Sequence, residues 1–217
     1  MVDKWEFKQE YKRYLPHIHS GNMPCFITWR LKFQIPKVNM DKYNNLKELH
    51  SQELSTFAPE QQESQTQKHQ KQLFAAFDDI MHNLEAYPQI LKDDDNVSEL
   101  KKVIHAHDKV MYKLYCYCIM PNHVHVLLEP LTIENSFTPL SKIMQTIKGS
   151  SSYNINKLRN ASGSIWQKES YDHVVRSDDE FKRIIGYILN NPVKSGLVDN
   201  WHDWKHNWIA DELCSDY

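Results

Sequence analysis

Glycine is scarce in this chain, with five residues in 217. The phosphate-binding loops of P-loop and dinucleotide-binding proteins need several glycines at fixed spacing, and neither pattern occurs. Long apolar runs are also missing, because no stretch approaches the roughly 18 uncharged apolar residues that span a bilayer. The sequence therefore predicts neither a nucleotide cofactor nor a membrane protein.

Cysteines are too few for a framework of disulfide bonds in a chain of this length. They are Cys25, Cys116, Cys118 and Cys214. Cys116 and Cys118 lie in an apolar, aromatic run, and their C-x-C spacing differs from that of zinc knuckles. We expect reduced thiols in the core. Residues 1–17 lack the apolar centre of a secretory signal, so the expected location is the cytoplasm.

An excess of positive charge is absent as well, because the net charge is −2. This argues against a simple basic nucleic-acid binder. The charges are unevenly distributed, however, with ten basic and five acidic residues in 101–176. A weakly basic middle is compatible with a local phosphate-binding surface, although a solvated charged face is the commoner explanation.

The hydrophobic pattern predicts an α+β protein. A two-residue alternation, rich in β-branched and aromatic residues, favours strands, and a three- to four-residue spacing favours helices. We expect strands at 25–33, 112–120, 123–129 and around 171–175, and helices at 97–110, 138–158 and 177–192. The helix at 177–192 should begin with Ser177 as its N-cap and end at Pro192. The βαββαβ order predicts a ferredoxin-like antiparallel sheet with helices on one face.

The chain is long enough for one ordinary domain, which we assign to residues 1–217. A polar, Gln-rich segment at about 36–83 interrupts the pattern. We interpret it as an inserted pair of helices joined near Pro59. Disorder is the alternative for this segment.

The stretch HVHVLLE follows a Pro-Asn turn signal and carries His123 and His125. Strand side chains alternate between faces, so both imidazoles project from one face about 7 Å apart. Two close imidazoles suit a divalent cation, because each ring nitrogen needs a partner. Two histidines at the surface or at the core edge are the open alternative.

The last predicted helix carries Tyr187 and Asn191 four residues apart, which places them on one face. Both could face the histidine pair. Two imidazoles and an amide oxygen could hold Mg²⁺ or Mn²⁺ with open positions, and a nearby tyrosine could attack a phosphodiester to give a phosphotyrosine. The alternative is a packed tyrosine and an asparagine that caps the helix.

Four stretches, read in order, resemble the REP-associated tyrosine transposases of the HUH single-tyrosine superfamily. They are YCIMPNHVHVLLEP, LSKIMQTIKGSSSYNINK, IWQKESYDHVVRSDDEF and YILNNPVKSGL. The resemblance covers residues 85–217 closely and extends to 26–31 and 13–19. That family has the ferredoxin-like fold.

The resemblance implies that His123 and His125 are the metal pair, Tyr187 the nucleophile and Asn191 the third ligand. The implied protein is a metal-dependent endonuclease and strand transferase acting on single-stranded DNA beside a hairpin-forming repeat. It would keep the 5′ phosphate on Tyr187 and need no ATP. A nucleoid-associated homodimer is the expected form.

Basic residues near the helix at 138–158 and the last strand are candidate DNA phosphate contacts. They are Lys148, Lys157, Arg159 and Arg176. Trp166 is a candidate for stacking on a base, with a core anchor as the alternative. Asp172 and His173 are candidates for orienting a metal ligand, with a turn aspartate and a partly exposed histidine as the alternative.

Two other functions fit the same residues. One is a hydrolytic phosphodiesterase that uses the histidine pair without a covalent intermediate. The other is a non-catalytic relative that binds DNA hairpins.

Overall fold

The computed structural model describes residues 11–12, 16–17, 23–82, 87–133 and 136–217. The chain divides into two compact units, which are described separately below. Unit 1 comprises Met1–Lys32 and Gln89–Tyr217, and unit 2 comprises Phe33–Pro88. Most of the 13–19 stretch that resembles the transposases lies outside the described residues.

Unit 1 is built on a five-stranded sheet in the order β8-β3-β5-β4-β9, with every neighbouring pair antiparallel. The predicted α+β class and antiparallel sheet are therefore confirmed. The fifth strand, β9, was not predicted, because three residues are too few to display an alternation. The strands are β3 (Cys25–Arg30), β4 (Tyr112–Ile119), β5 (His123–Pro130), β8 (Tyr171–Val174) and β9 (Asn207–Ile209).

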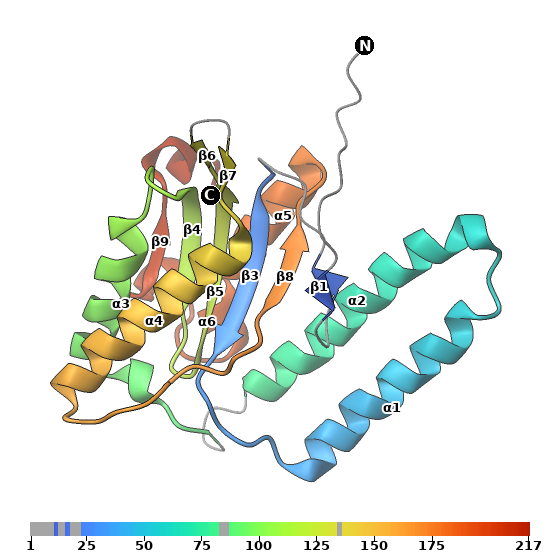
Figure 1. The fold of residues 1–217 in the computed structure, drawn as a ribbon, viewed down its shortest axis with the longest axis horizontal. Helices are drawn as coiled ribbons and strands as arrows, with labels where there is room; N and C mark the ends of the chain where they lie inside the picture. The colour runs from blue at the N-terminus through green and yellow to red at the C-terminus, as the bar shows by residue number, and fades with distance from the viewer. Residues whose placement is uncertain (1–10, 13–15, 18–22, 83–86, 134–135) are drawn as a thin grey trace. The chain divides into compact units, whose positions relative to one another are not determined.

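Helices α3 (Asp94–Ala106) and α4 (Leu140–Leu158) connect the strands and cover one face of the sheet (Figure 1). Trp29 points to this face and packs edge-on against Trp166. The Trp166 indole N–H donates a hydrogen bond to the Ser151 hydroxyl of α4. Helix α5 (Asp178–Leu189) follows the βαββαβ unit and covers the opposite face. The two connecting helices thus lie on one face as predicted, and the last helix closes the other.

Helix α5 begins where the sequence predicts. The Ser177 hydroxyl accepts the Glu180 backbone N–H at 3.2 Å, and the acidic first turn complements the helix dipole. The predicted continuation to Pro192 is wrong, because α5 ends at Leu189 and a separate turn, α6 (Asn191–Lys194), follows. Proline is well tolerated in the first turn of a helix, so Pro192 helps to start α6 instead of ending α5.

The remaining elements of unit 1 are short. Two-residue strands pair β1 with β2 and β6 with β7. No helix among the described residues has the length and apolar character needed to cross a membrane. The short elements are β1 (Tyr11–Lys12), β2 (Pro16–His17), η2 (Ile90–Lys92), β6 (Thr132–Ile133), β7 (Ser136–Phe137), η3 (Trp201–Asp203) and η4 (Asp211–Asp216).

Unit 2 consists of the predicted pair of inserted helices, α1 (Lys37–Leu54) and α2 (Pro59–Met81). Aromatic contacts join the two helices, since Tyr43 meets Phe77 edge-on and the imidazoles of His50 and His69 stack at 4.0 Å. The helical insertion is confirmed. A single domain over residues 1–217 stays a prediction.

The core thiols agree with the sequence analysis. Cys116 and Cys118 are both fully buried on β4, and both are reduced thiols. Burial raises the pKa of the Cys25 thiol to about 12, and it also raises the pKa of Cys116. These buried thiols remain protonated and act as small apolar side chains.

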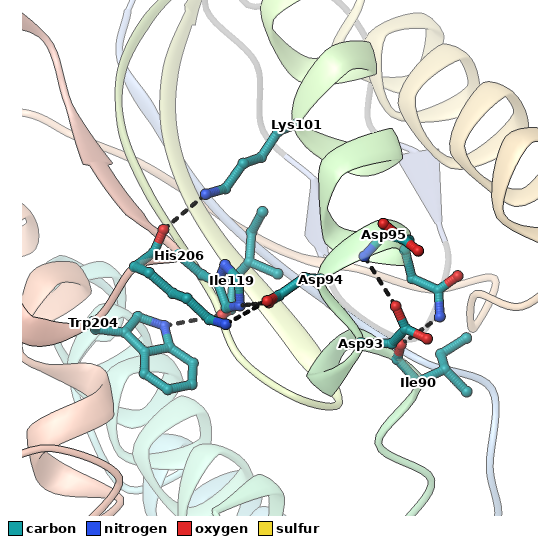
Figure 2. A network of polar contacts seen from close by, with 10 residues as sticks. Ile90, Asp93, Asp94, Asp95, Lys101, Ile119, Trp204 and His206 are labelled. Carbon is teal, nitrogen blue, oxygen red and sulfur yellow. Dashed lines mark hydrogen bonds and ion pairs between the residues drawn. The ribbon is translucent and has the colours of Figure 1, made fainter.

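A polar network ties the C-terminal segment to the start of α3 and the end of β4 (Figure 2). The Asp94 carboxylate accepts Lys205 Nζ at 2.5 Å and His206 Nε2 at 3.2 Å. The Trp204 indole donates to the Ile119 carbonyl at 3.1 Å. These contacts hold the chain where it enters β9, so they support the edge of the sheet.

The buried His206 imidazole makes the stability of unit 1 depend on pH. Burial, followed by the nearby Lys101 ammonium, lowers the pKa of His206 to about 4, although Asp94 opposes this shift. The unfolded chain takes up a proton near pH 6.5 and the folded chain only near pH 4. Stability is therefore lost as the pH falls through this window.

We predict that lowering the pH from 7 to 5 reduces the free energy of unfolding by on the order of 1 kcal/mol through His206. Chemical denaturation at the two pH values measures this. His206→Gln keeps an N–H for Asp94 and should show a smaller pH dependence. An equal loss in both proteins would contradict the assignment.

Candidate metal and tyrosine site

His123 and His125 lie on the face of the sheet that α5 covers. Their rings are fully buried, with centroids 4.7 Å apart. The two Nε2 atoms point at each other across 3.0 Å. Two nitrogens that bind one octahedral cation at about 2.1 Å lie roughly 3 Å apart, so this spacing fits a shared ion.

Each imidazole is oriented through its other nitrogen. His125 Nδ1 lies 2.7 Å from the Thr28 hydroxyl of β3, and His123 Nδ1 lies 2.5 Å from Asn122 Oδ1. The asparagine oxygen can only accept, so His123 carries its proton on Nδ1 and offers a lone pair at Nε2. A proton on His125 or a cation between the rings satisfies that lone pair. Metal-binding histidines usually form such a hydrogen bond through the ring nitrogen that does not bind the metal.

The strand pairing explains why these partners meet. In the antiparallel register Thr28 lies opposite His125, and Arg30 lies opposite His123. Paired residues share a face, so the Thr28 side chain is brought to the His125 ring. Asn122 occupies the turn between β4 and β5. Thr28 and Asn122 were not among the predicted site residues, although a polar residue in an apolar strand was a usable signal.

Tyr187 of α5 reaches the same place. Its ring centroid lies 5.6 Å from that of His125, in an edge-to-face contact, and 5.8 Å from that of Phe26 on β3. Tyr187 is partly exposed, whereas the two histidines are buried. The structure thus brings together the predicted tyrosine and one imidazole of the predicted pair.

Asn191 does not continue the α5 helix as the spacing suggested. It is buried in the first position of α6, where its carbonyl accepts the N–H and the hydroxyl of Ser195. Its backbone therefore stabilises the turn that follows Tyr187. A ligand role for its side chain stays a prediction.

Asp172 and His173 separate onto opposite faces of β8. Asp172 pairs with Ile27, whose side chain points away from the histidine pair. His173 pairs with Phe26 on the histidine side, and its Nε2 lies 3.0 Å from Glu180 Oε1. His173 therefore anchors the start of α5 to β8, and Glu180 is a positioning residue that the sequence analysis missed.

The predicted DNA contacts divide into exposed and internally bonded side chains. Lys157, Arg159 and Arg176 are exposed, so their role as phosphate partners stays a prediction. Lys148 instead donates to three consecutive backbone carbonyls, those of residues 167–169, at 3.1–3.3 Å. Its ammonium holds this segment against α4, which leaves it poorly suited to bind phosphate.

Trp166 does not fit the predicted stacking on a base. Its side chain is 2% exposed, packs edge-on against Trp29, and donates its indole N–H to Ser151 at 2.9 Å. An exposed fraction of this size leaves almost no ring surface on which a base could stack. The alternative, a core tryptophan that anchors the sheet, is the one observed.

A family model described as "Transposase IS200 like" matches residues 80–191, more than half of the chain. The chain belongs to this family. A protein of Haemophilus influenzae with the provisional name REP-associated tyrosine transposase is 28% identical over 102 residues, covering 44% of this chain and 58% of the relative. The REP-associated tyrosine transposase of Escherichia coli is 26% identical over 95 residues, covering 43% and 52%.

A solved structure, described as a REP-associated tyrosine transposase bound to a REP hairpin, aligns with this transposase-family chain at a TM-score of 0.46 and 16% identity. The alignment covers 92% of this chain and 82% of the other. The sequence matches span little more than half the length of the two relatives from Haemophilus influenzae and Escherichia coli. The match of residues 80–191 to the family model confirms the predicted transposase family.

We predict that Thr28→Val weakens Mn²⁺ binding by about tenfold, because it removes the hydroxyl that orients His125 while keeping the side-chain shape. Isothermal titration of the whole chain with MnCl₂ measures this. Thr28→Ser keeps the hydroxyl and should bind like the parent, whereas His125→Ala should not bind. Equal affinity of Thr28→Val and the parent would contradict the orienting role.

Proposed function

We propose that this chain is a metal-dependent endonuclease and strand transferase for single-stranded DNA, with Tyr187 as its nucleophile. One observation carries the proposal: the Nε2 atoms of His123 and His125 converge to 3.0 Å, beside the Tyr187 ring. Membership of the transposase family supports the same conclusion.

The residues suited to hold a divalent ion are His123 and His125, with Asn191 as the third ligand. Imidazole and amide donors with open positions suit Mg²⁺ or Mn²⁺ when phosphate oxygens complete the shell. When bound, such an ion polarises the phosphodiester and stabilises charge on the leaving oxygen. Thr28 and Asn122 keep both rings oriented for this role.

Tyr187 would attack the phosphorus with its hydroxyl oxygen, forming the new P–O bond as the bond to the 3′ oxygen breaks. The phenol loses its proton and the departing 3′ oxygen gains one, so the products are a 5′-phosphotyrosine and a free 3′-OH. The phosphotyrosine linkage to the DNA is itself a phosphodiester, like the DNA bond that it replaces. A 3′-OH can therefore reverse the reaction and join strands without ATP.

The substrate we propose is single-stranded DNA beside a hairpin-forming repeat. A REP hairpin is the ligand of the solved structure described above, which supports this class of partner. A homodimer and association with the nucleoid are further expectations from the family resemblance.

We predict that the parent chain, incubated with Mn²⁺ and single-stranded repeats from its own genome, forms a covalent DNA adduct that resists denaturation. Tyr187→Phe removes the nucleophilic oxygen while keeping the ring contacts with His125 and Phe26, so it should bind DNA and form no adduct. Chelation of the metal should abolish adduct formation by the parent. Denaturing gels with labelled DNA measure adduct formation in all three reactions, and a native gel measures DNA binding by Tyr187→Phe.

Each alternative function gives a different result in the same experiment. Cleavage that persists in Tyr187→Phe would indicate a hydrolytic phosphodiesterase. Binding by the parent without any cleavage in Mn²⁺ would indicate a non-catalytic hairpin binder. Either result would overturn the proposed tyrosine chemistry.

A further inference from the structure

A cleft of about 1700 Å³ lies beside α4 in unit 1. One side of α4 and the chain from Ala161 to Asp172 line it. The cleft lies on the α4 side of the sheet, away from the histidine pair, because Asp172 and Ile27 share that face. Sites for small molecules usually measure about 300–1000 Å³, so this cleft is large enough for an extended ligand.

The cleft is lined by more positive than negative side chains. Four exposed lysines contribute, whereas the acidic residues are Glu169 and Asp172. Among the residues that the structure describes, no ion pair is found for these four lysines, so their charges are available to a ligand. The four are Lys32, Lys142, Lys157 and Lys168.

Tyr153 gives the cleft an aromatic surface. Tyr153 lines the cleft from α4, and its side chain is 70% exposed. A tyrosine ring is normally packed against other residues over much of its surface. Nucleic-acid bases stack on such rings whatever their sequence. An exposed aromatic between lysines is therefore suited to a single strand, whose bases are not held in pairs.

Gly149 lies one helical turn before Tyr153 and also lines the cleft. Glycine within a helix is destabilising, and a Cβ added here would meet nothing within 4 Å. Packing inside the protein therefore does not require glycine at this position. The missing side chain leaves the helix backbone open to close approach by a ligand at this position.

We propose that this cleft binds a segment of single-stranded DNA, with phosphates on Lys142 and Lys157, a base on Tyr153 and the strand passing close to Gly149. The inference rests on the proposed function for the identity of the nucleic acid. The cleft ends at the edge strand β8, where Asp172 faces the cleft and His173 faces the Tyr187 side. The bound segment thus lies on the opposite side of the sheet from Tyr187, past the edge strand β8. The cleft residues therefore contribute to DNA binding and not to the chemical step.

The first test compares Tyr153→Ala with Tyr153→Phe. Both are made in the Tyr187→Phe chain, so that binding is measured without covalent trapping. Fluorescence anisotropy with a labelled single-stranded oligonucleotide should show a loss of about tenfold or more for Tyr153→Ala. Tyr153→Phe keeps the ring and should bind like its parent. Unchanged affinity of Tyr153→Ala would overturn the stacking contact.

The second test uses the salt dependence of the same binding reaction. Lys142→Gln and Lys157→Gln should each reduce the slope of log K against log salt by about 0.7, because each removes one phosphate contact to a single strand. Lys102→Gln removes the same charge from α3, outside the cleft, and should leave the slope unchanged. If Lys142→Gln and Lys157→Gln have the same slope as Lys102→Gln, the cleft is not the binding surface.

The third test fills the cleft. Gly149→Gln replaces a poor helix former and projects a neutral side chain into open space, so the melting temperature should rise while DNA affinity falls. Ser150→Gln makes a similar change on the same helix but outside the cleft, and should keep the affinity. Tight DNA binding by Gly149→Gln would contradict a close approach there.

Adduct formation by the same cleft variants with Tyr187 intact separates the inference from the proposed function. If the parent forms an adduct and the cleft variants bind DNA unchanged, the inference fails and the proposed function stands. If the parent forms no adduct but the cleft variants lose DNA binding, the function fails and the cleft assignment stands. Equal competition by an unlabelled duplex would overturn the assignment to a single strand.

Discussion

Two buried imidazole nitrogens that face each other across 3.0 Å need either a hydrogen on one of them, donated to the other, or a metal ion that both bind. The rest of the site depends on this constraint. The rings cannot turn away without breaking the contacts of their Nδ1 atoms with Thr28 and Asn122. The register of β3 on β5 therefore fixes the spacing of the pair, and a slip of one residue would carry Thr28 to the other face.

The helix that carries Tyr187 is fixed to the same sheet at its first turn. Glu180 binds His173 of β8 through one carboxylate oxygen and the Arg176 backbone N–H through the other. Ser177 caps the first turn. Three neighbouring strands, β8, β3 and β5, thus hold the start of α5, the Phe26 contact and the two imidazoles. The sheet positions the tyrosine as well as the histidines.

The features that could be predicted from sequence are those with a local cause. The alternation around His123 and His125 and the cap at Ser177 each depend on a few adjacent residues, and both are found as expected. The roles of Lys148 and Trp166 depend on partners 15 to 21 residues away. No local pattern identifies such partners, so the sequence could not reveal that both side chains are bonded inside the protein.

The end of α5 was mispredicted for a related reason. Proline has opposite effects at the two ends of a helix, and sequence alone does not say which end Pro192 occupies. The structure places it in the first turn of α6, which separates Asn191 from the Tyr187 helix. Similarly, the exposure of Tyr153 could not be read from its spacing, because the side of α4 that stays uncovered depends on the path of residues 161–172.

Because side chains alternate along β8, Asp172 lies on one face of the sheet and its neighbour His173 lies on the other. The sheet therefore lies between the cleft proposed to bind DNA and the site formed by the histidine pair and Tyr187. Substitutions along α4 can therefore alter the proposed DNA-binding cleft while leaving the histidine pair, on the opposite face of the sheet, in place.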